Sequence, residues 1–366
     1  MKKILKLTLS LFLILSSLAL ACTGITIKTL DNKIVQGRTI EYGESNLNSK
    51  LVVSPRGKEY QSLTPDGKLA GYKWKGKYGY VGASLITDMF IGEGINEAGL
   101  NAGLFYFPHY GSLTKYDKKI SKKSIVDMQV VSWILSNFAT VDEVKEGLKK
   151  IKVVNIGYDE KGNPLPTAHW RVADSKGGNI VIDIVNNGEV KIHDNKIGVL
   201  TNSPDYQWHV KNLNNYINLY AGNAKNFNVN GQEFFSFGAG TGAMGLPGDI
   251  TPPSRFVRAF YFLNTMKPAE TSKEAINEAF HILNNFDLPI GVEYPAEHKS
   301  YIPKDLPSAT QWTAISSLND REFYYKTMYN SQIRKVDLKK IDFSTVKYTV
   351  LPLDEKPEEN IQEITF

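Results

Sequence analysis

Residues 22–42 read CTGITIKTLDNKIVQGRTIEY, a pattern that is typical of a β-hairpin. Polar and apolar residues alternate over Thr23–Lys28 and again over Lys33–Ile40, which is the period of strands with one buried face. Asp31-Asn32 lies between the two runs and favours a turn. The stretch therefore predicts two antiparallel strands whose outer edges can pair with further strands of a sheet.

Cys22, the first residue of this stretch, follows a segment that is typical of a removable signal peptide. The chain begins with three lysines in six residues, residues 7–18 are mostly apolar, and Ala19-Leu20-Ala21 matches the small-x-small pattern that a signal peptidase recognises. Cleavage after Ala21 would leave residues 22–366 as a periplasmic or secreted protein. Cys22 would then carry both a thiol and a free α-amino group.

This combination of groups predicts a nucleophile that needs no distant histidine. A thiol has an ordinary pKa of about 8.5 and an α-amine of about 8, so the neutral amine can take the proton from the thiol and the thiolate can attack a carbonyl. The hairpin should bring Arg38 and Glu41 back beside Cys22. A nearby arginine lowers a thiol pKa, and Glu41 could hold either Arg38 or the α-ammonium group.

Other interpretations of these residues stay open. Cys22 could be the lipidated cysteine of a lipoprotein, although Ala19 stands where such signals usually have leucine. It could also be a buried, unreactive cysteine, which is a common place for a free thiol. Arg38 and Glu41 could form an ordinary surface ion pair. A papain-like cysteine–histidine enzyme would need a local signature around its cysteine, and that signature is missing.

Composition argues against several classes of protein. Hydrophobic residues make up 42% and charged residues 22% of the 366 residues, as in ordinary soluble globular proteins. The net charge of +5 is spread without a basic block, so no nucleic-acid partner is expected. No apolar run of about 20 residues follows the signal peptide, so no membrane span is expected in the processed chain. With one cysteine and scattered histidines, we expect no disulfide, metal or cofactor.

The remaining chain predicts groups of strands separated by groups of helices. Strands are expected at 51–55, 78–88, on both sides of a glycine-rich turn within 92–104, at 168–174, 179–185, 190–193 and, as the last pair, at 310–317 and 322–327. Helices are expected at 124–136, 140–150, 208–220, 254–266 and 272–285, loops at 57–77, and a loose tail at 354–363. Without regular βαβ alternation, repeats or linkers, this predicts one α+β layered domain.

Two further stretches could belong to a site. Phe105–Tyr110 holds four aromatic residues in six, which favours either core or the wall of an apolar pocket. Asn202 lies just past a predicted strand and could donate its side-chain amide to a developing oxyanion, although a turn-forming asparagine is the commoner explanation.

Taken together, several motifs resemble the choloylglycine hydrolase family, which contains the bile salt hydrolases and penicillin V acylases. They occur in the family's order over most of the chain after residue 21: Cys22-Thr23-Gly24, Gly37–Tyr42, Asn96–Leu100, Leu200–Pro204, and Leu246–Asp249 with Ser254–Arg258. The resemblance implies the N-terminal nucleophile hydrolase fold, a four-layer αββα sandwich of two antiparallel sheets. It also implies hydrolysis of a linear carboxamide through a thioester, and commonly a homotetramer.

The resemblance also implies roles for individual residues. Cys22 matches the nucleophile and Arg38 the arginine beside it. Asn202 matches the asparagine of the oxyanion hole, and Arg255 the remaining active-site arginine. Glu41 occupies the place where many members have aspartate, so its longer side chain could aim differently at the α-amine or at the arginine.

A second departure from the family concerns the substrate. In many members an asparagine follows an Ala-Gly-Leu motif, whereas here Ala102-Gly103-Leu104 is followed by Phe105-Tyr106. A side-chain amide is therefore lost at this place, while a backbone N–H could still serve the oxyanion. Both residues are candidates for binding an apolar acyl group. An apolar aromatic wall would suit conjugated bile salts, penicillin V and N-acyl homoserine lactones alike, and an exported enzyme rich in such aromatic residues favours phenoxyacetyl or acyl-lactone amides among the three. The rival interpretation, from another class, is a lipid-anchored or secreted binding protein with Phe105–Tyr110 as its ligand wall.

Overall fold

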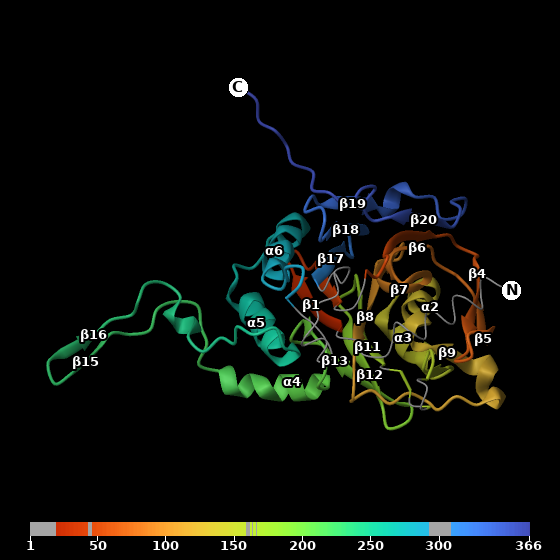
Figure 1. Ribbon diagram of the computed structural model, residues 1–366, viewed down its shortest axis with the longest axis horizontal. Coiled ribbons are helices and arrows are strands. Elements are labelled where there is room, and N and C mark those ends of the chain that lie inside the picture. Colours follow the sequence, from red (N-terminus) through yellow and green to blue (C-terminus); the bar gives the residue numbers. More distant parts are fainter. Residues whose placement is uncertain (1–19, 43–45, 159–161, 163, 166, 293–308) are drawn as a thin grey trace.

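Two large antiparallel sheets lie face to face in the computed structural model, which describes residues 20–42, 46–158, 162, 164–165, 167–292 and 309–366 (Figure 1). The signal-peptide prediction for residues 1–21 falls outside the described residues except for Leu20 and Ala21, which begin the first strand. No helix among the described residues is long and apolar enough to cross a membrane.

The first sheet is built on the predicted hairpin. Cys22 lies opposite Ile40 and Gly24 lies opposite Arg38, so the alternation in the sequence is confirmed as antiparallel pairing. Its six strands run in the order β14 (Val199–Leu200), β1 (Leu20–Lys28), β2 (Ile34–Tyr42), β17 (Ala309–Ser317), β18 (Glu322–Thr327) and β19 (Arg334–Asp337).

The second sheet faces the first and has eight strands. Neighbouring strands pair antiparallel throughout, as in the first sheet. They run in the order β13 (Glu189–Asp194), β12 (Asn179–Val185), β11 (Ala168–Asp174), β8 (Leu100–Tyr106), β7 (Thr87–Asn96), β6 (Tyr80–Leu85), β3 (Lys50–Ser54) and β20 (Thr349–Pro352).

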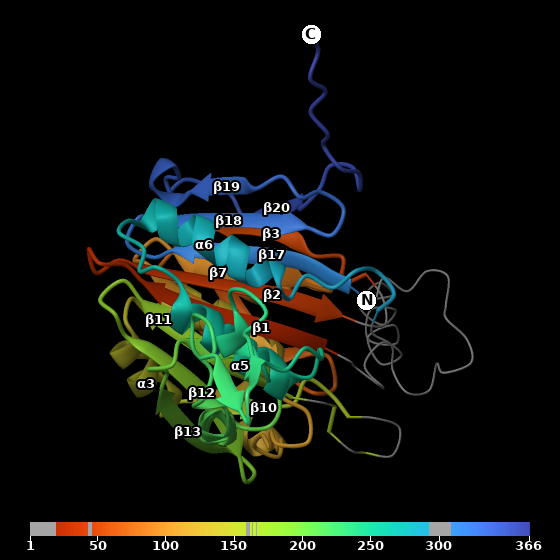
Figure 2. The same cartoon turned by 90° about the vertical axis from the view of Figure 1, so that its left-hand side faces the viewer.

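Helices cover the outer face of each sheet. The pair α5 (Pro252–Thr265) and α6 (Ser272–Asn284) packs on β1 and β2, while α2 (Val130–Asn137) and α3 (Val141–Leu148) pack on the second sheet (Figures 1 and 2). The predicted four-layer αββα sandwich is therefore confirmed. Interior residues of the two sheets alternate with outward ones, because successive side chains on a strand point to opposite faces.

Local sequence signals set where the helices begin. The Thr140 side chain accepts a hydrogen bond from the Glu143 backbone N–H at the start of α3, and Thr271 does the same for Glu274 at the start of α6. Prolines occupy the first turn of α5, where a missing N–H costs nothing. Such caps satisfy N–H groups that the helix itself leaves without partners.

Shorter elements complete the described chain. The strands are β4 (Glu59–Leu63) paired with β5 (Leu69–Lys75), β9 (Ser124–Val126) paired with β10 (Lys152–Val154), and β15 (Phe227–Val229) paired with β16 (Gln232–Phe234). The helix α4 (Tyr206–Asn212) continues as a 3₁₀ turn, and the 3₁₀ turns are Lys118–Lys123, Asp127–Gln129, Leu213–Tyr216, Thr241–Ala243 and Leu338–Lys340.

Several predictions of secondary structure were wrong in part. The helix expected at 208–220 runs from Tyr206 to Asn212 and, with its 3₁₀ continuation, ends at Tyr216. Residues 57–77 form the β4–β5 hairpin rather than loops, because Tyr60 and Trp74 stack across the strands with ring centroids 5.0 Å apart and give this glycine- and lysine-rich segment its packing. The helix predicted at 124–136 begins instead as a strand and a 3₁₀ turn. The pair 310–317 and 322–327 is not the last, because β19 and β20 follow and extend the edges of the two sheets.

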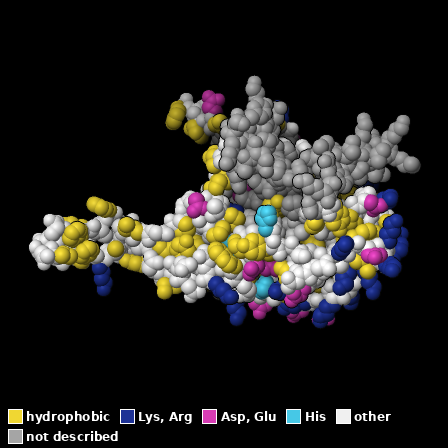
Figure 3. Space-filling view, turned by 60° about the horizontal axis from the view of Figure 1, so that its bottom comes forward, with side chains coloured by type: hydrophobic (Ala, Val, Ile, Leu, Met, Phe, Trp, Pro, Cys, Tyr) yellow, Lys and Arg dark blue, Asp and Glu magenta, His cyan; other side chains and the backbone are white. Residues whose placement is uncertain are grey.

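An arm that the sequence did not predict projects from the sandwich between α4 and α5. It carries β15 and β16 and extends well away from the sheets (Figure 1). Its aromatic side chains are exposed: Phe227 and Phe234 stack on each other at 4.9 Å, and Phe237 is 97% exposed. Hydrophobic side chains lie along it in the space-filling view (Figure 3).

Gly24 is required where the two sheets approach each other beside Cys22. A Cβ atom at this position would lie 2.6 Å from the Phe105 ring and 2.7 Å from the Arg171 guanidinium, both of which belong to the second sheet. Atoms that are not bonded to each other do not pack so closely, so the substitution of an alanine must push the sheets apart or displace both side chains.

We expect Gly24→Ala to destabilise the fold by about 1–3 kcal/mol, the usual cost of overpacking a close-packed core. Urea unfolding should show a lower midpoint at an unchanged slope. Gly248→Ala is the matched control, since a Cβ there meets no atom within 4 Å and its φ is not in the left-handed region. Equal midpoints for Gly24→Ala and the wild type would contradict the close approach of the sheets.

Candidate active site

Cys22 lies in the space between the two sheets, with 1% of its surface exposed. Its sulfur accepts a hydrogen bond from Arg38 Nη2 at 2.7 Å. Arg38 lies on β2 two residues before Ile40, the residue that pairs with Cys22, so its side chain is on the same face of the hairpin as the Cys22 side chain. The expectation that the hairpin returns this arginine to the cysteine agrees with the geometry.

The backbone of the second sheet orients the Arg38 guanidinium. Nη1 donates to the carbonyl oxygens of Gly92 and Leu104 at 3.1 and 2.5 Å, and Nε donates to the Thr39 carbonyl at 3.1 Å. The Phe105 ring lies 4.3 Å from the guanidinium carbon. These contacts leave Nη2 for the sulfur, so a charged donor is held against the thiol in advance.

Burial outweighs this cation in the chain as described, where Cys22 is still joined to Ala21. Removal from water raises the pKa of the Cys22 thiol, and the Glu41 carboxylate raises it further. Arg38, Arg255 and a backbone hydrogen bond from Tyr106 lower it, but the thiol pKa stays above its ordinary value. The predicted effect of Arg38 thus has the right sign, while the expected thiolate at neutral pH does not follow for the uncleaved chain.

Asn202 and Arg255 grip the backbone of the same cysteine. Asn202 Oδ1 accepts from the Cys22 backbone nitrogen and from Arg255 Nη2, both at 2.8 Å. Arg255 Nη1 donates to the Cys22 carbonyl oxygen at 2.5 Å and to Thr23 Oγ1 at 2.9 Å. Asn202 follows β14 and Arg255 lies in the first turn of α5, so elements far apart in sequence converge on one residue.

The Asn202 side chain also reaches the second sheet. Its Nδ2 donates to the Tyr106 carbonyl oxygen at 2.9 Å, which uses one of the two N–H groups of the amide. The amide has one further N–H group beyond this bond.

Glu41 is buried beside the cysteine but not beside Arg38. It pairs with Ala21 across the hairpin, and its Oε1 accepts from Thr310 Oγ1 at 3.2 Å. Positions 38 and 41 are three apart on one strand, so their side chains point to opposite faces of the sheet. Of the two roles expected for Glu41, holding Arg38 does not fit this geometry, and holding the α-ammonium group stays a prediction.

The carboxylate near Arg38 belongs instead to Glu93, which the sequence reasoning missed. Its Oε2 lies 3.9 Å from Arg38 Nη1, while its Oε1 lies 3.3 Å from Arg171 Nη2 and accepts from Asn101 Nδ2 at 2.7 Å. Burial lowers the pKa of Arg171 to about 10. The available signal was an acidic residue at an inward position of a strand, three residues before the Asn96–Leu100 motif.

Phe105 and Tyr106 lie at the end of β8 against this site. The Phe105 ring is fully buried, 4.3 Å from the Arg38 guanidinium carbon and 5.5 Å from that of Arg171. Its side chain therefore belongs to the core between the sheets. Tyr106, 7% exposed, contributes its main chain to both Asn202 and the Cys22 sulfur. Contact of either side chain with a substrate stays a prediction.

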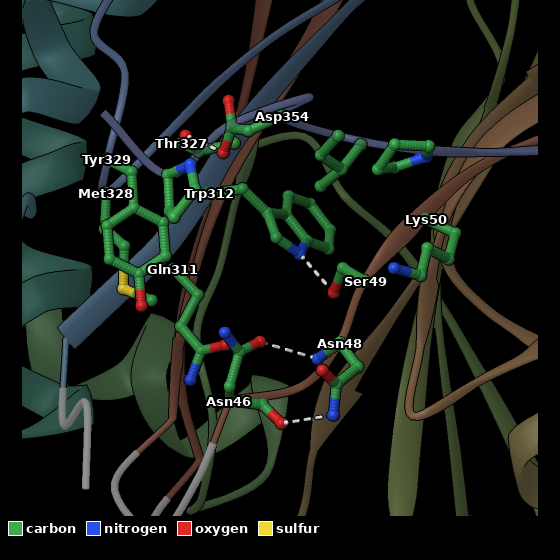
Figure 4. Close-up of a pocket in the computed structure, with 13 residues that line it drawn as sticks. Asn46, Asn48, Ser49, Lys50, Gln311, Trp312, Thr327, Met328, Tyr329 and Asp354 are labelled. Atoms are coloured by element: carbon green, nitrogen blue, oxygen red, sulfur yellow. Dashed lines mark hydrogen bonds between the residues drawn. The ribbon is translucent and has the colours of Figure 1, made fainter. Parts of the chain in front are cut away.

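The described residues contain no group of three or more His, Cys, Asp or Glu side chains that could hold a metal ion. A hollow lies near the start of β17, and the ring of Trp312, which lines it, is 5.6 Å from the Arg38 guanidinium carbon (Figure 4). There Trp312 Nε1 donates to Ser49 Oγ at 2.9 Å, and Thr327 Oγ1 donates to Asp354 Oδ2 at 2.7 Å. No cysteine or histidine lines this hollow, so the chemistry concentrates at Cys22.

A family model and several known proteins match this chain, and they agree on one family. Residues 22–351 match the family model "Linear amide C-N hydrolases, choloylglycine hydrolase family". A bile salt hydrolase/transferase from Clostridium perfringens is 35% identical over 321 residues, which cover 87% of this chain and 93% of that protein. A penicillin V acylase from Pectobacterium atrosepticum is 25% identical over 375 residues, covering 94% and 88%.

Solved structures agree with the fold. The crystal structure of a mutant conjugated bile acid hydrolase from Clostridium perfringens superposes with a TM-score of 0.78 at 30% identity, covering 94% of this chain and all of that one. The match of the family model to most of the chain, together with these relatives, shows that this chain is a hydrolase of linear amide C–N bonds and belongs to the choloylglycine hydrolase family.

Proposed function

We propose that the protein is exported, that cleavage after Ala21 makes Cys22 the N-terminal residue, and that Cys22 then hydrolyses amides through a thioester. The observation that carries the proposal is the 2.7 Å contact between Arg38 Nη2 and the Cys22 sulfur, at a residue whose own backbone is held by Asn202 and Arg255. Arg38 places a positive charge at the thiol, and Asn202 holds the nitrogen that would become the α-amine. Both contacts suit an activated N-terminal cysteine.

Cleavage supplies the missing base. While Cys22 is joined to Ala21, its nitrogen is an amide and cannot accept a proton. After cleavage the same nitrogen is an amine, placed by its hydrogen bond to Asn202 Oδ1. It can take the thiol proton, and the resulting thiolate stays paired with Arg38. The leader sequence supports export, since it has the charged start, apolar run and small-x-small end of a signal peptide.

The reaction follows from these positions. The thiolate sulfur bonds to the amide carbon, and the carbonyl oxygen becomes an oxyanion that the free N–H of Asn202 Nδ2 and the Tyr106 backbone N–H can stabilise. The α-ammonium group returns its proton to the leaving nitrogen as the C–N bond breaks, which leaves a thioester. Water, deprotonated by the amine, then attacks the thioester and releases the acid and the free cysteine.

For the substrate we propose an amide with a large apolar acyl group. The residues alone favoured phenoxyacetyl or acyl-lactone amides. The greater identity to a protein named bile salt hydrolase/transferase, 35% against 25% for a penicillin V acylase, makes conjugated bile salts the first choice and penicillin V the alternative. N-acyl homoserine lactones complete the set to be tested.

We also propose assembly into a homotetramer, which the family resemblance implies and the arm supports. Exposed apolar surface of this kind marks protein contacts on soluble proteins. The groove at the base of the arm is likewise apolar, being lined by Ile217, Tyr220 and Phe260 among others. Contact between copies would cover both surfaces at once.

The first prediction concerns processing. We expect the chain that begins at Cys22 to hydrolyse glycocholate, taurocholate or penicillin V, and both the uncleaved chain and Cys22→Ala to show no turnover. Intact mass checks the N-terminus. A diacylglyceryl adduct on the sulfur would instead support the lipid-anchored binding protein, and turnover by Cys22→Ala would contradict the nucleophile.

The second prediction concerns the thiol. Because burial raises the pKa of the Cys22 thiol in the uncleaved chain, its alkylation by iodoacetamide should rise with a midpoint above the ordinary value of about 8.5. After cleavage the adjacent α-ammonium group and Arg38 should lower the midpoint. Cys22 is the sole cysteine, so the labelled mass reports this group alone. Identical midpoints in the two forms would contradict activation by cleavage.

The third prediction concerns the oxyanion. Asn202→Ala should lower kcat by about 10²–10³, the usual loss for one oxyanion donor, in a chain that still folds. Asn277→Ala, at an exposed position of α6, is the matched control and should keep full activity. Near-normal turnover by Asn202→Ala would remove this residue from the mechanism.

The fourth prediction concerns the arm. Replacing Phe227 and Phe234 by serine should shift the protein from tetramer to smaller species in light scattering, because the stacked pair would lose its apolar contact with another copy. A wild-type protein that is monomeric at micromolar concentration would contradict the proposed assembly.

A further inference from the structure

Two of the six histidines contact the backbone at Thr201 and Asn202, and a third, His193, lies 3.3 Å from the Asp183 carboxylate that also contacts the first of them. His209 comes from α4, His169 from β11 and His193 from β13. His169 and His209 are fully buried, and neither has a place in the reaction described above. His169 directs a ring nitrogen at the backbone of Thr201, and His209 directs one at the backbone of Asn202, the two residues that follow β14 (Val199–Leu200).

His209 holds the carbonyl of Asn202 itself. Its Nε2 lies 2.9 Å from the Asn202 backbone oxygen, and because a carbonyl oxygen only accepts, the proton is on Nε2. Burial lowers the pKa of His209 to about 4, so the ring is neutral near pH 7. The other ring nitrogen is buried without a hydrogen-bond partner among the described residues. The Phe256 ring stacks on the imidazole at 4.7 Å and fixes its plane.

His169 holds the preceding carbonyl. Its Nε2 lies 3.0 Å from the Thr201 backbone oxygen and its Nδ1 lies 2.9 Å from Asp183 Oδ1. Because a carbonyl oxygen only accepts, Nε2 is the donor to Thr201, while Nδ1 lies against the Asp183 carboxylate. Although burial opposes ionisation, hydrogen bonds from His169 and His193 keep the pKa of Asp183 well below its usual range. Phe107 stacks on His169 at 4.3 Å.

We propose that His209 and the His169–Asp183 pair are positioning residues that aim the Asn202 side chain at the reaction centre. Two imidazole N–H groups fix two successive carbonyls, so the peptide plane from which Asn202 projects cannot rotate freely. The inference rests on the proposed function, because it assigns the fixed side chain to the oxyanion. None of these three residues is placed in contact with the substrate.

The energetic argument concerns an unsatisfied carbonyl. Without the His209 donor the buried Asn202 oxygen loses a hydrogen bond, which is costly in a site closed to water. The peptide is then expected to turn toward another donor and to carry the Asn202 side chain with it. Displacement of a catalytic donor by about 1 Å can cost on the order of a hundredfold in rate, with little change in substrate binding.

The test is a double-mutant cycle with matched replacements. His209→Phe keeps a flat ring against Phe256 but removes the N–H, and His209→Gln restores an N–H at similar reach. We expect His209→Phe to lower kcat about tenfold to a hundredfold at nearly constant KM, His209→Gln to recover most of the loss, and the surface control His281→Phe to change nothing. In the Asn202→Ala background, His209→Phe should cost less than about threefold.

A second readout needs no activity. In the uncleaved chain the Cys22 backbone N–H donates to Asn202 Oδ1, so hydrogen exchange at this amide should quicken in His209→Phe and in Asn202→Ala, but no further in the double variant. If His209→Phe does not fold, His209→Met supplies another side chain without an N–H. Equal losses of kcat in both backgrounds, or unchanged exchange at Cys22, would overturn the positioning role. If exchange at the Cys22 amide is faster in His209→Phe but the wild-type protein hydrolyses none of the amides, the positioning role is upheld and the proposed function is overturned.

Discussion

The hydrogen bond between Arg38 and the Cys22 sulfur is the interaction on which the site depends. It exists because a short hairpin places the two residues on one face, and because a second sheet supplies the carbonyls that fix the guanidinium. Beside this pair, Gly24 has no side chain, which leaves room between the sheets for the Phe105 ring and the Arg171 guanidinium. The packing of the two sheets therefore also sets the geometry of the site. If the sheets moved apart, the second sheet would no longer hold the Arg38 guanidinium against the Cys22 thiol.

Burial gives this arrangement a second property. A thiol that is shut away from water resists ionisation, and in the uncleaved chain the neighbouring nitrogen cannot help. Under the proposed function, removal of residues 1–21 would create the base and the reactive thiolate in one step. The Cys22 thiol would then stay unreactive until residues 1–21 are removed. This suits a nucleophile that is made in one compartment and used in another.

Much of the fold and part of the site could be predicted from sequence. Alternation over residues 23–40 is a local signal and located the hairpin correctly, and the helices expected at 140–150 and 272–285 agree with α3 and α6. Ordered motifs identified the family and its sandwich. What failed was non-local. Glu93 lies near Arg38 only because the two sheets stack, and His169 and His209 reach the backbone of Thr201 and Asn202 only because β11, β14 and α4 pack together. The arm has no core of its own, so no periodic pattern marked it.

The most direct test of the central claim is capture of the acyl intermediate. The processed protein would be mixed with glycocholate or penicillin V, quenched in acid within the first turnovers, digested and examined by mass spectrometry. The account predicts the acyl mass on the peptide that begins at Cys22, removed by hydroxylamine as a thioester should be. Turnover with the acyl group on another residue, or by a chain whose Cys22 nitrogen is still an amide, would contradict it.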